Sequence, residues 1–517
     1  MILYMAIVLY APSLALNKVT GFNLWGSVIS VGVVCTFYTT LGGMKAVLWT
    51  DVFQVAIMMI GLLATLIEGC IRAGGFNNAW EHARESGRIV FDDFNPDPAV
   101  RHTFWSLVIG GYFTWLAVYG VNQAQVQRAC TCPTLKKAQL ALWLNFPGLC
   151  MILYICCLIG IVLYDFYRTC DPKSYGLVQQ ADQLLPLYVM DILGFLKGLP
   201  GLFIACLFSG ALSTISSGLN SLSTVILEDV IRTYIIKDMP ENKATWISKI
   251  LVLILGFLCL GLAYVASLLG GVLQAALSLF GMIGGPLLGL FTLGLFFPWA
   301  NKWGAYTGLI GSLIFMFWIG IGAQTYKFPS PKSMIDISGC NWNVTQPPPT
   351  INITTIPTTT VAEATTITPV QVLYTLSYLW YSATAVLTTL VIGLLVSFAT
   401  GHTKAKDVNP NLMVPFFDIV FPCLPEKIRK PLRFGVDYSG RYGVSSGRPR
   451  LQVSTISGNH VSNNPVGIAT PRTGILKTPS HSTSSVDSGR ESSKTTSFSD
   501  DVSVVTITSR VSYESCV

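Results

Sequence analysis

The stretch with the greatest capacity for chemistry is residues 198–221, which is rich in hydroxyl side chains. Ser213 and Thr214 lie near its centre, with Ser209, Ser216 and Ser217 close by. Hydroxyl and main-chain carbonyl oxygens are ligands that suit hard cations such as Na⁺. The stretch therefore predicts a cation site. The alternative is close helix packing, because Ser, Thr and Gly are also favoured where membrane helices touch.

Two further stretches predict interrupted helices. Gly110 and Gly111 lie within an apolar run, and Asn122 and Gln123 follow it. A glycine pair can unwind a membrane span, and the N-terminus of a half-helix then directs partial positive charge at an anionic group. Residues 281–286, Gly-Met-Ile-Gly-Gly-Pro, predict a second break or kink. Interrupted helices around a midplane cavity indicate a secondary transporter; plain kinks that help helices to pack are the alternative.

Groups for catalysis are absent from the apolar runs. All five histidines lie outside them, and Asp51 and Glu68 lie at the two ends of one run. A membrane enzyme needs clustered nucleophiles or acid–base groups, and a proton pump needs a relay of carboxylates. We therefore expect no enzymatic activity and no cofactor, with Na⁺ as a co-transported ion.

The composition is that of a polytopic membrane protein. Of 517 residues, 51% are hydrophobic and only 11% are charged, and the mean hydropathy is +0.55. Soluble domains carry about 25% charged residues, so the composition excludes an ordinary soluble enzyme. The net charge of +7 is too small to indicate a nucleic-acid partner, and in membrane proteins such a surplus lies on cytoplasmic loops.

Apolar runs near the length of about 20 residues that a bilayer requires predict ten spans, the first one partial. Their approximate ranges are 1–16, 22–42, 48–69, 103–120, 140–164, 199–227, 246–269, 271–299, 304–323 and 374–400.

The loops predict an orientation. Asn343 and Asn352 begin glycosylation sequons in a Thr/Pro-rich loop at about 326–369, which favours an external loop. Counting spans from this loop places the basic loops inside, in agreement with the positive-inside pattern. The N-terminus and the tail then face the cytoplasm. The same count puts Cys170 and Cys340 outside, where a disulfide is permitted.

The tail, residues 401–517, differs in composition from the spans, residues 1–400. It is polar and rich in Ser and Thr, so we expect it to be largely disordered. Its last residues, Ser515, Cys516 and Val517, fit the pattern that PDZ domains capture by the terminal carboxylate. A chance match of three residues is the alternative.

Residues 38–54, Tyr-Thr-Thr-Leu-Gly-Gly-Met-Lys-Ala-Val-Leu-Trp-Thr-Asp-Val-Phe-Gln, resemble the signature of the sodium/solute symporters. The resemblance extends over about residues 1–400. Within the family, residues 10–17, 101–105, 120–128 and 376–382 are most similar to the sodium-dependent multivitamin transporters. The sodium-coupled monocarboxylate transporters are nearly as similar, and the iodide symporter is less similar.

The resemblance implies an all-α fold of the leucine-transporter type, with two inverted five-helix repeats. By family position, Ser213 and Thr214 supply hydroxyl ligands for sodium, and Gly210 supplies a carbonyl. The resemblance also implies a set of residues around the substrate: Asn122, Gln123, Thr114, Gln274 and Ser278.

Family members have further helices before the point where this sequence begins, so the first repeat is expected to be incomplete. This suggests a truncated isoform or an incomplete gene model. The implied activity is sodium-coupled symport of a carboxylate-bearing solute (biotin, pantothenate or lipoate) across the plasma membrane. The alternatives are short monocarboxylates such as lactate or nicotinate, iodide, or a non-transporting regulatory isoform.

Overall fold

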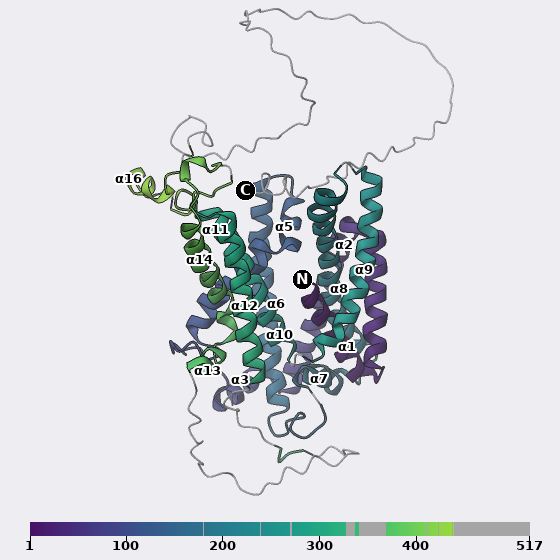
Figure 1. The fold of residues 1–517 in the computed structure, drawn as a ribbon. Coiled ribbons are helices and arrows are strands. Elements are labelled where there is room, and N and C mark those ends of the chain that lie inside the picture. The colour runs from purple at the N-terminus through teal and green to yellow at the C-terminus, as the bar shows by residue number, and fades with distance from the viewer. Residues whose placement is uncertain are drawn as a thin grey trace, which may run out of the picture.

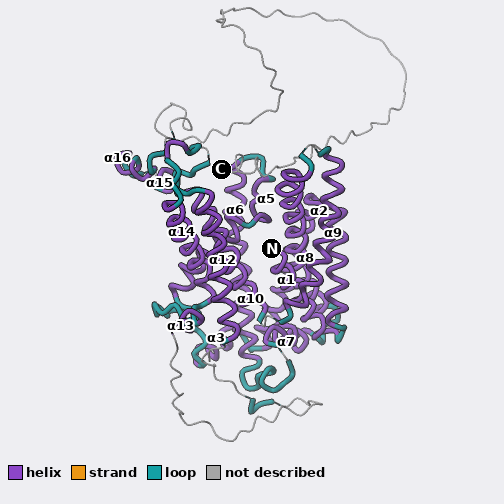
Figure 2. Tube along the Cα trace, in the orientation of Figure 1, coloured by secondary structure: helices purple, strands orange, loops and turns teal. Residues whose placement is uncertain are grey.

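The computed structural model describes residues 1–178, 180–237, 239–268, 271–326, 337–340, 369–410, 412–421, 423–436 and 438. Within these ranges all regular structure is helical (Figure 2), which confirms the predicted all-α membrane fold. The predicted glycosylation residues Asn343 and Asn352 lie outside the described residues, as do Ser515, Cys516 and Val517.

The helices and helical turns follow in chain order. They are α1 (Ile2–Thr20), α2 (Leu24–Arg72), α3 (Phe76–Glu85), η1 (Ser106–Gly110), α4 (Gly111–Leu116), η2 (Ala117–Val121), α5 (Gln123–Cys130), α6 (Leu135–Phe166), η3 (Ala181–Gln183), α7 (Leu184–Leu193), α8 (Leu199–Val225), η4 (Ile226–Ile235), α9 (Glu241–Ala266), α10 (Val272–Leu279), η5 (Phe280–Gly284), α11 (Gly285–Phe296), α12 (Lys302–Thr325), α13 (Pro369–Tyr374), η6 (Tyr378–Trp380), α14 (Tyr381–Ala399), η7 (Ala405–Asp407), α15 (Phe416–Val420), α16 (Glu426–Arg429) and η8 (Pro431–Arg433).

Nine segments of the described residues are long and apolar enough to cross a membrane. They coincide with nine of the ten predicted spans and are Ile2–Thr20, Leu24–Gly42, Val47–Arg72, Leu135–Phe166, Leu199–Ile235, Glu241–Ala266, Val272–Phe296, Lys302–Thr325 and Tyr378–Ala399. The tenth prediction, residues 103–120, corresponds to a shorter apolar segment, Ser106–Val121, which begins and ends in π-helical turns.

Two of these spans lie within α2, on either side of residues 43–46. The first packs against α9 in the opposite direction, because Trp25 contacts Tyr264 near one end of α9 and Thr36 lies against Gly256 further along it. The second packs against α8.

The helices form two groups (Figure 1). Helices α1, α2, α8 and α9 lie on one side of the bundle, and α11, α12 and α14 lie on the other, with α5, α6 and α10 between them. Met5 and Leu9 of α1 are buried against Leu219 of α8 and Cys259 of α9. Figure 1 places Met1 between the two ends of the bundle.

Helices α12 and α14 approach so closely that their contact requires glycine. A Cβ atom added to Gly308 would lie 2.7 Å from the carbonyl oxygen of Thr389 and 3.1 Å from the Cα atom of Gly393. Small residues permit such backbone contact, which replaces the hydrophobic effect as a source of helix association in lipid. This contact holds together the group formed by α11, α12 and α14.

We expect Gly308→Val to destabilise the protein by about 1–3 kcal/mol, because overpacking forces backbone shifts. Gly261→Val is the control, since a Cβ atom at Gly261 meets nothing within 4 Å. Thermal denaturation of the detergent-solubilised protein, followed by size-exclusion chromatography, measures the difference. Equal midpoints for the two variants would contradict the packing described here.

Candidate functional site

The backbone leaves the helical conformation at Asn122, where φ is −75° and ψ is 119°. The side chain of Asn122 caps α5, since its Oδ1 atom accepts a hydrogen bond from the N–H of Ala124 at 3.1 Å. Asparagine is among the best residues for this position. A helix break therefore separates Ser106–Val121 from α5, and the N-terminus of α5 begins at Gln123.

The predicted break at Gly110 and Gly111 is wrong. Both residues have helical dihedral angles, and Gly110 serves as a contact point, because a Cβ atom there would lie 2.6 Å from the carbonyl oxygen of Leu379. The predicted break at 281–286 is a π-helical turn, η5, which continues directly into α11 with Pro286 in the first turn. Proline is tolerated there because the first N–H groups of a helix have no intrahelical partner.

The three predicted sodium ligands occupy one turn of α8. The hydroxyl of Thr214 donates to the carbonyl of Gly210 at 3.1 Å, and Ser213 and Thr214 are half-buried. Ser213 also lies beside the carboxyl group of Asp51 on α2. The arrangement brings a carboxylate, two hydroxyls and a carbonyl together, and such oxygen ligands suit a hard cation.

Asp51 forms an ion pair that sequence reasoning missed. Its Oδ2 atom accepts from Nη2 of Arg128, on α5, at 2.5 Å, and Arg128 also donates to the hydroxyl of Ser217 on α8. The side chain of Asp51 is 14% exposed, and its Oδ1 atom is buried without a hydrogen-bond partner. The two residues are 77 positions apart, so the sequence alone gave no signal of the pairing.

Hydrogen bonds next to this ion pair join α5 to α8. Ser221 donates to Oε1 of Gln127 at 2.9 Å, and Gln127 donates through Nε2 to Thr224 at 3.3 Å. The hydroxyls of Ser217 and Ser221 therefore hold α5 against α8, as the packing alternative for this stretch predicts.

A second polar cluster lies near the opposite end of the bundle. Arg101 donates to Oε1 of Gln274, on α10, and its guanidinium lies 5.4 Å from the centre of the Tyr378 ring. The Nε2 atom of His102 lies 3.1 Å from the hydroxyl of Tyr378, and Ser377 donates to the carbonyl of Arg101 at 3.0 Å. Burial is the larger of two effects that lower the pKa of His102 below its ordinary value, and the charge of Arg101 is the other.

The other predicted substrate residues are distributed between these clusters. Thr114 is buried, and its hydroxyl lies 3.0 Å from that of Ser382 on α14. Gln123 begins α5, and Ser278 lies one turn after Gln274 in α10. Within the described residues no hydrogen bond links Asn122, Gln123, Gln274 and Ser278 to one another, so they form separate parts of the interior.

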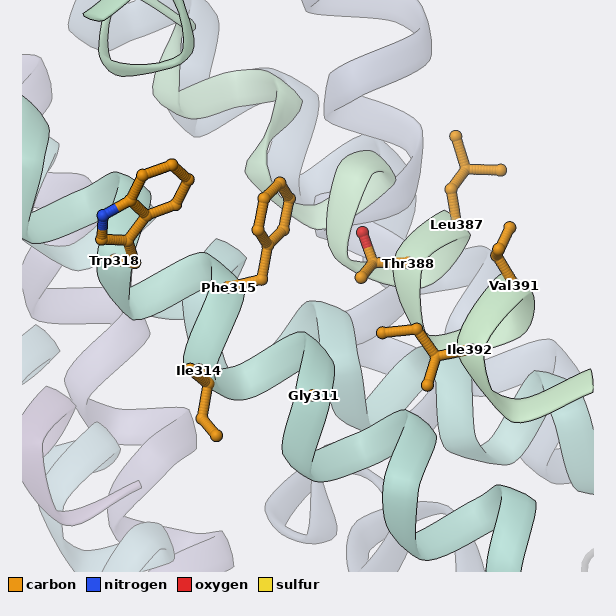
Figure 3. Close-up of a pocket in the computed structure, with 8 residues that line it drawn as sticks. All are labelled: Gly311, Ile314, Phe315, Trp318, Leu387, Thr388, Val391 and Ile392. Atoms are coloured by element: carbon orange, nitrogen blue, oxygen red, sulfur yellow. The ribbon is translucent and has the colours of Figure 1, made fainter. Parts of the chain in front are cut away.

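A groove of about 560 Å³ lies between α12 and α14 and is shown in Figure 3. Its walls are apolar apart from Thr388, and Ile314, Leu387 and Val391 on its rim are more than half exposed. In a bilayer such residues face acyl chains. The groove therefore has no group that could bind a charged solute.

Cys170 and Cys340 are joined by a disulfide, with a Cα–Cα distance of 4.9 Å. This is the pair that the counting of spans placed on one side of the membrane. The N–H of Gly339 also donates to the carbonyl of Thr169 at 3.0 Å, so the backbone supports the covalent link.

A profile of the sodium:solute symporter family matches residues 1–312. The chain belongs to this family. The family's class of activity, sodium-coupled solute symport, is therefore the class of activity of this chain. The fold agrees: the chain is similar to the solved structure of a Na⁺-coupled sialic acid symporter, with a TM-score of 0.57 and 22% identity, over 78% of this chain and 72% of that one.

Relatives within the family include two kinds of transporter. Sodium-coupled monocarboxylate transporter 2 of Danio rerio is 44% identical over 86% of this chain and 70% of its own length, and transporter 1 of Homo sapiens is 48% identical over 80% and 68%. The sodium-dependent multivitamin transporter of Oryctolagus cuniculus is 47% identical over 84% and 68%. The chain thus spans about two thirds of the length of these relatives.

We expect Asp51→Asn to lower stability by about 1–3 kcal/mol, because it leaves the charge of Arg128 in a partly buried site without its partner. The double variant Asp51→Asn/Arg128→Gln should recover part of this loss. Glu81→Gln is the control, since Glu81 and Arg84 form an exposed pair. Thermal denaturation measures all variants, and a double variant less stable than Asp51→Asn would contradict the pairing.

The lowered pKa of His102 predicts a pH effect. The unfolded chain binds the proton more readily than the folded one, so stability should fall as the pH falls below about 6.5. The variant His102→Gln, which cannot titrate at this position, should lose less stability than the wild type between pH 7 and pH 5. His402→Gln, at an exposed position, is the control and should follow the wild type. An identical pH profile for His102→Gln and the wild type would refute this expectation.

Proposed function

We propose that the chain carries out sodium-coupled symport of organic solutes that bear one carboxylate, of the biotin, pantothenate and lipoate class. The observation that carries the proposal is the helix break at Asn122. It provides main-chain N–H groups at the start of α5, together with the neutral amide of Gln123. A carboxylate needs such donors, and helix N-termini within a membrane supply them without a buried cation.

Sodium is proposed to bind at Gly210, Ser213 and Thr214. Ser213 lies beside Asp51, whose charge is paired with that of Arg128, so the proposed ligands are the two hydroxyls and the carbonyl. Entry of an anion into a cell that is negative inside is opposed by about 2.3 kcal/mol per 100 mV. Each Na⁺ that enters with the solute cancels one negative charge, so the membrane potential no longer opposes entry. Coupling to sodium therefore provides the driving force.

Alternating access requires closure at both ends of the solute path, and the two polar clusters are suited to it. At one end, Arg128 and Gln127 of α5 bond to α2 and α8. At the other, Arg101 and Tyr378 connect the segment before η1 with α10 and η6. These bonds link different helices, so they can break when the helix groups move apart.

Transport of short monocarboxylates such as lactate or nicotinate is the second candidate, and it is favoured by the names of the relatives from Danio rerio and Homo sapiens. Both candidates use the same carboxylate chemistry and differ in the body of the solute.

The orientation and surroundings are also proposals. We infer insertion in the plasma membrane, with the basic loops and the tail in the cytoplasm, and with glycans on Asn343 and Asn352 outside. A PDZ-domain partner at Ser515–Val517 is proposed from the sequence pattern alone.

The test is uptake of labelled biotin by cells that express the chain, in sodium medium and in choline medium, with excess lactate or nicotinate as competitors. We expect uptake only with sodium. Surface labelling and a glycan-shift blot show whether the chain reaches the surface. Absence of biotin uptake by a chain at the surface would refute the first candidate, and absence of uptake of labelled lactate as well would refute transport and favour a regulatory role.

We expect Ser213→Ala/Thr214→Ala to reduce sodium-dependent uptake at least tenfold with an unchanged surface level, because it removes two hydroxyl ligands. Thr292→Ala is the matched control: Thr292 donates to the carbonyl of Leu288 at 2.7 Å, the same four-residue bond that Thr214 makes. Similar losses in the two variants would mean that Ser213 and Thr214 are structural.

A further inference from the structure

The described residues of the first part of the tail, within 401–438, are here called the proximal tail, and they pack onto the ends of the spans. The N–H and the hydroxyl of Thr403 donate to the carbonyls of Trp299 and Ala300 at 3.3 and 3.1 Å. The N–H of Val414 donates to the carbonyl of Leu295, at the end of α11, at 3.1 Å. These bonds fix the proximal tail at the level where a bilayer passes from hydrocarbon to headgroups.

The proximal tail has its own ionic centre. The carboxylate of Asp418 is 3% exposed and binds Arg433 through both oxygens, at 2.8 and 3.1 Å, and Arg429 at 3.0 Å. Aromatic contacts add to this, because the ring of Phe434 lies 5.1 Å from that of Trp299. The segment is therefore a folded cap on the bundle.

The surface of this cap combines apolar and basic side chains. Six apolar residues are more than 40% exposed: Leu412, Phe416, Ile419, Val420, Phe421 and Ile428. Four lysines are exposed and make no salt bridge within the described residues: Lys404, Lys406, Lys427 and Lys430. Apolar rings beside lysines are typical of segments that lie in a membrane interface.

A groove of about 410 Å³ opens beside the cap, between α11 and the start of α12. Leu290, Phe291 and Leu295 of α11 form an apolar wall, and Leu412 of the cap closes one side. Lys302, which is exposed, is the charged residue of the lining. An apolar trough with a lysine on its lining matches an acyl chain attached to a phosphate.

We propose that this groove binds an anionic phospholipid of the leaflet on the side of the proximal tail. An acyl chain lies against α11 and Leu412, and the phosphate contacts Lys302. The exposed lysines of the cap attract the headgroup, and the apolar side chains of α15 hold the cap in the interface. The site is separate from the candidate sodium and substrate residues, and it does not depend on which solute is transported.

Native mass spectrometry of the purified full chain tests the proposal. The probes are 1-palmitoyl-2-oleoyl phosphatidylserine and the matching phosphatidylcholine, added at increasing concentration. We expect phosphatidylserine to bind at several-fold lower concentration. Lys302→Gln should weaken its binding three- to tenfold and weaken phosphatidylcholine binding less, because the choline group already balances the charge of the phosphate. Lys243→Gln is the control, since Lys243 is exposed in the first turn of α9 and outside the groove. Leu412→Ser should weaken the binding of both lipids.

Equal binding of the two lipids, or equal effects of Lys302→Gln and Lys243→Gln, would overturn the proposal. Glycerol 3-phosphate is a further probe. If glycerol 3-phosphate displaced phosphatidylserine at the same concentration as the lipid, the acyl chain would not be bound. This result would also overturn the proposal. A thermal midpoint for each variant excludes misfolding as the cause of a loss.

Discussion

Within a bilayer a main-chain group that leaves the helical pattern has no water to bond, so the protein itself must supply its partners. Asn122 meets this constraint. Its extended backbone ends one helical segment, and its side chain caps the next. An amide can do this without adding charge to the interior. The arrangement of the surrounding helices therefore depends on a residue that both breaks and restarts a helix.

The few charges of the interior obey a related rule. Asp51 is paired with Arg128, and Arg128 also donates to the hydroxyl of Ser217 on α8. Arg101, by contrast, is bonded to a neutral amide and stacked on an aromatic ring. The two clusters thus differ in chemistry: at one a guanidinium is paired with a carboxylate, and at the other a guanidinium is bonded to a neutral amide.

Span lengths and hydropathy were sufficient to predict nine membrane segments, because crossing a bilayer imposes one strong requirement on a sequence. The position of the helix break was beyond such reasoning. Glycine can unwind a helix or permit close contact, and only the neighbouring carbonyl of Leu379 shows that Gly110 does the second. The sodium candidates were found through their residue types, whereas the ion pair at Asp51 depends on helices that are distant in sequence.

The disulfide between Cys170 and Cys340 also constrains how often the chain crosses the membrane. Four candidate spans lie between the two cysteines, Leu199–Ile235, Glu241–Ala266, Val272–Phe296 and Lys302–Thr325. An even number returns the chain to the side from which it started, whichever side that is. Were Val272–Phe296 to turn back at η5 or Pro286, the number would be odd and the two sulfur atoms would face opposite compartments. The bond therefore requires the glycine- and proline-containing segment to cross only once.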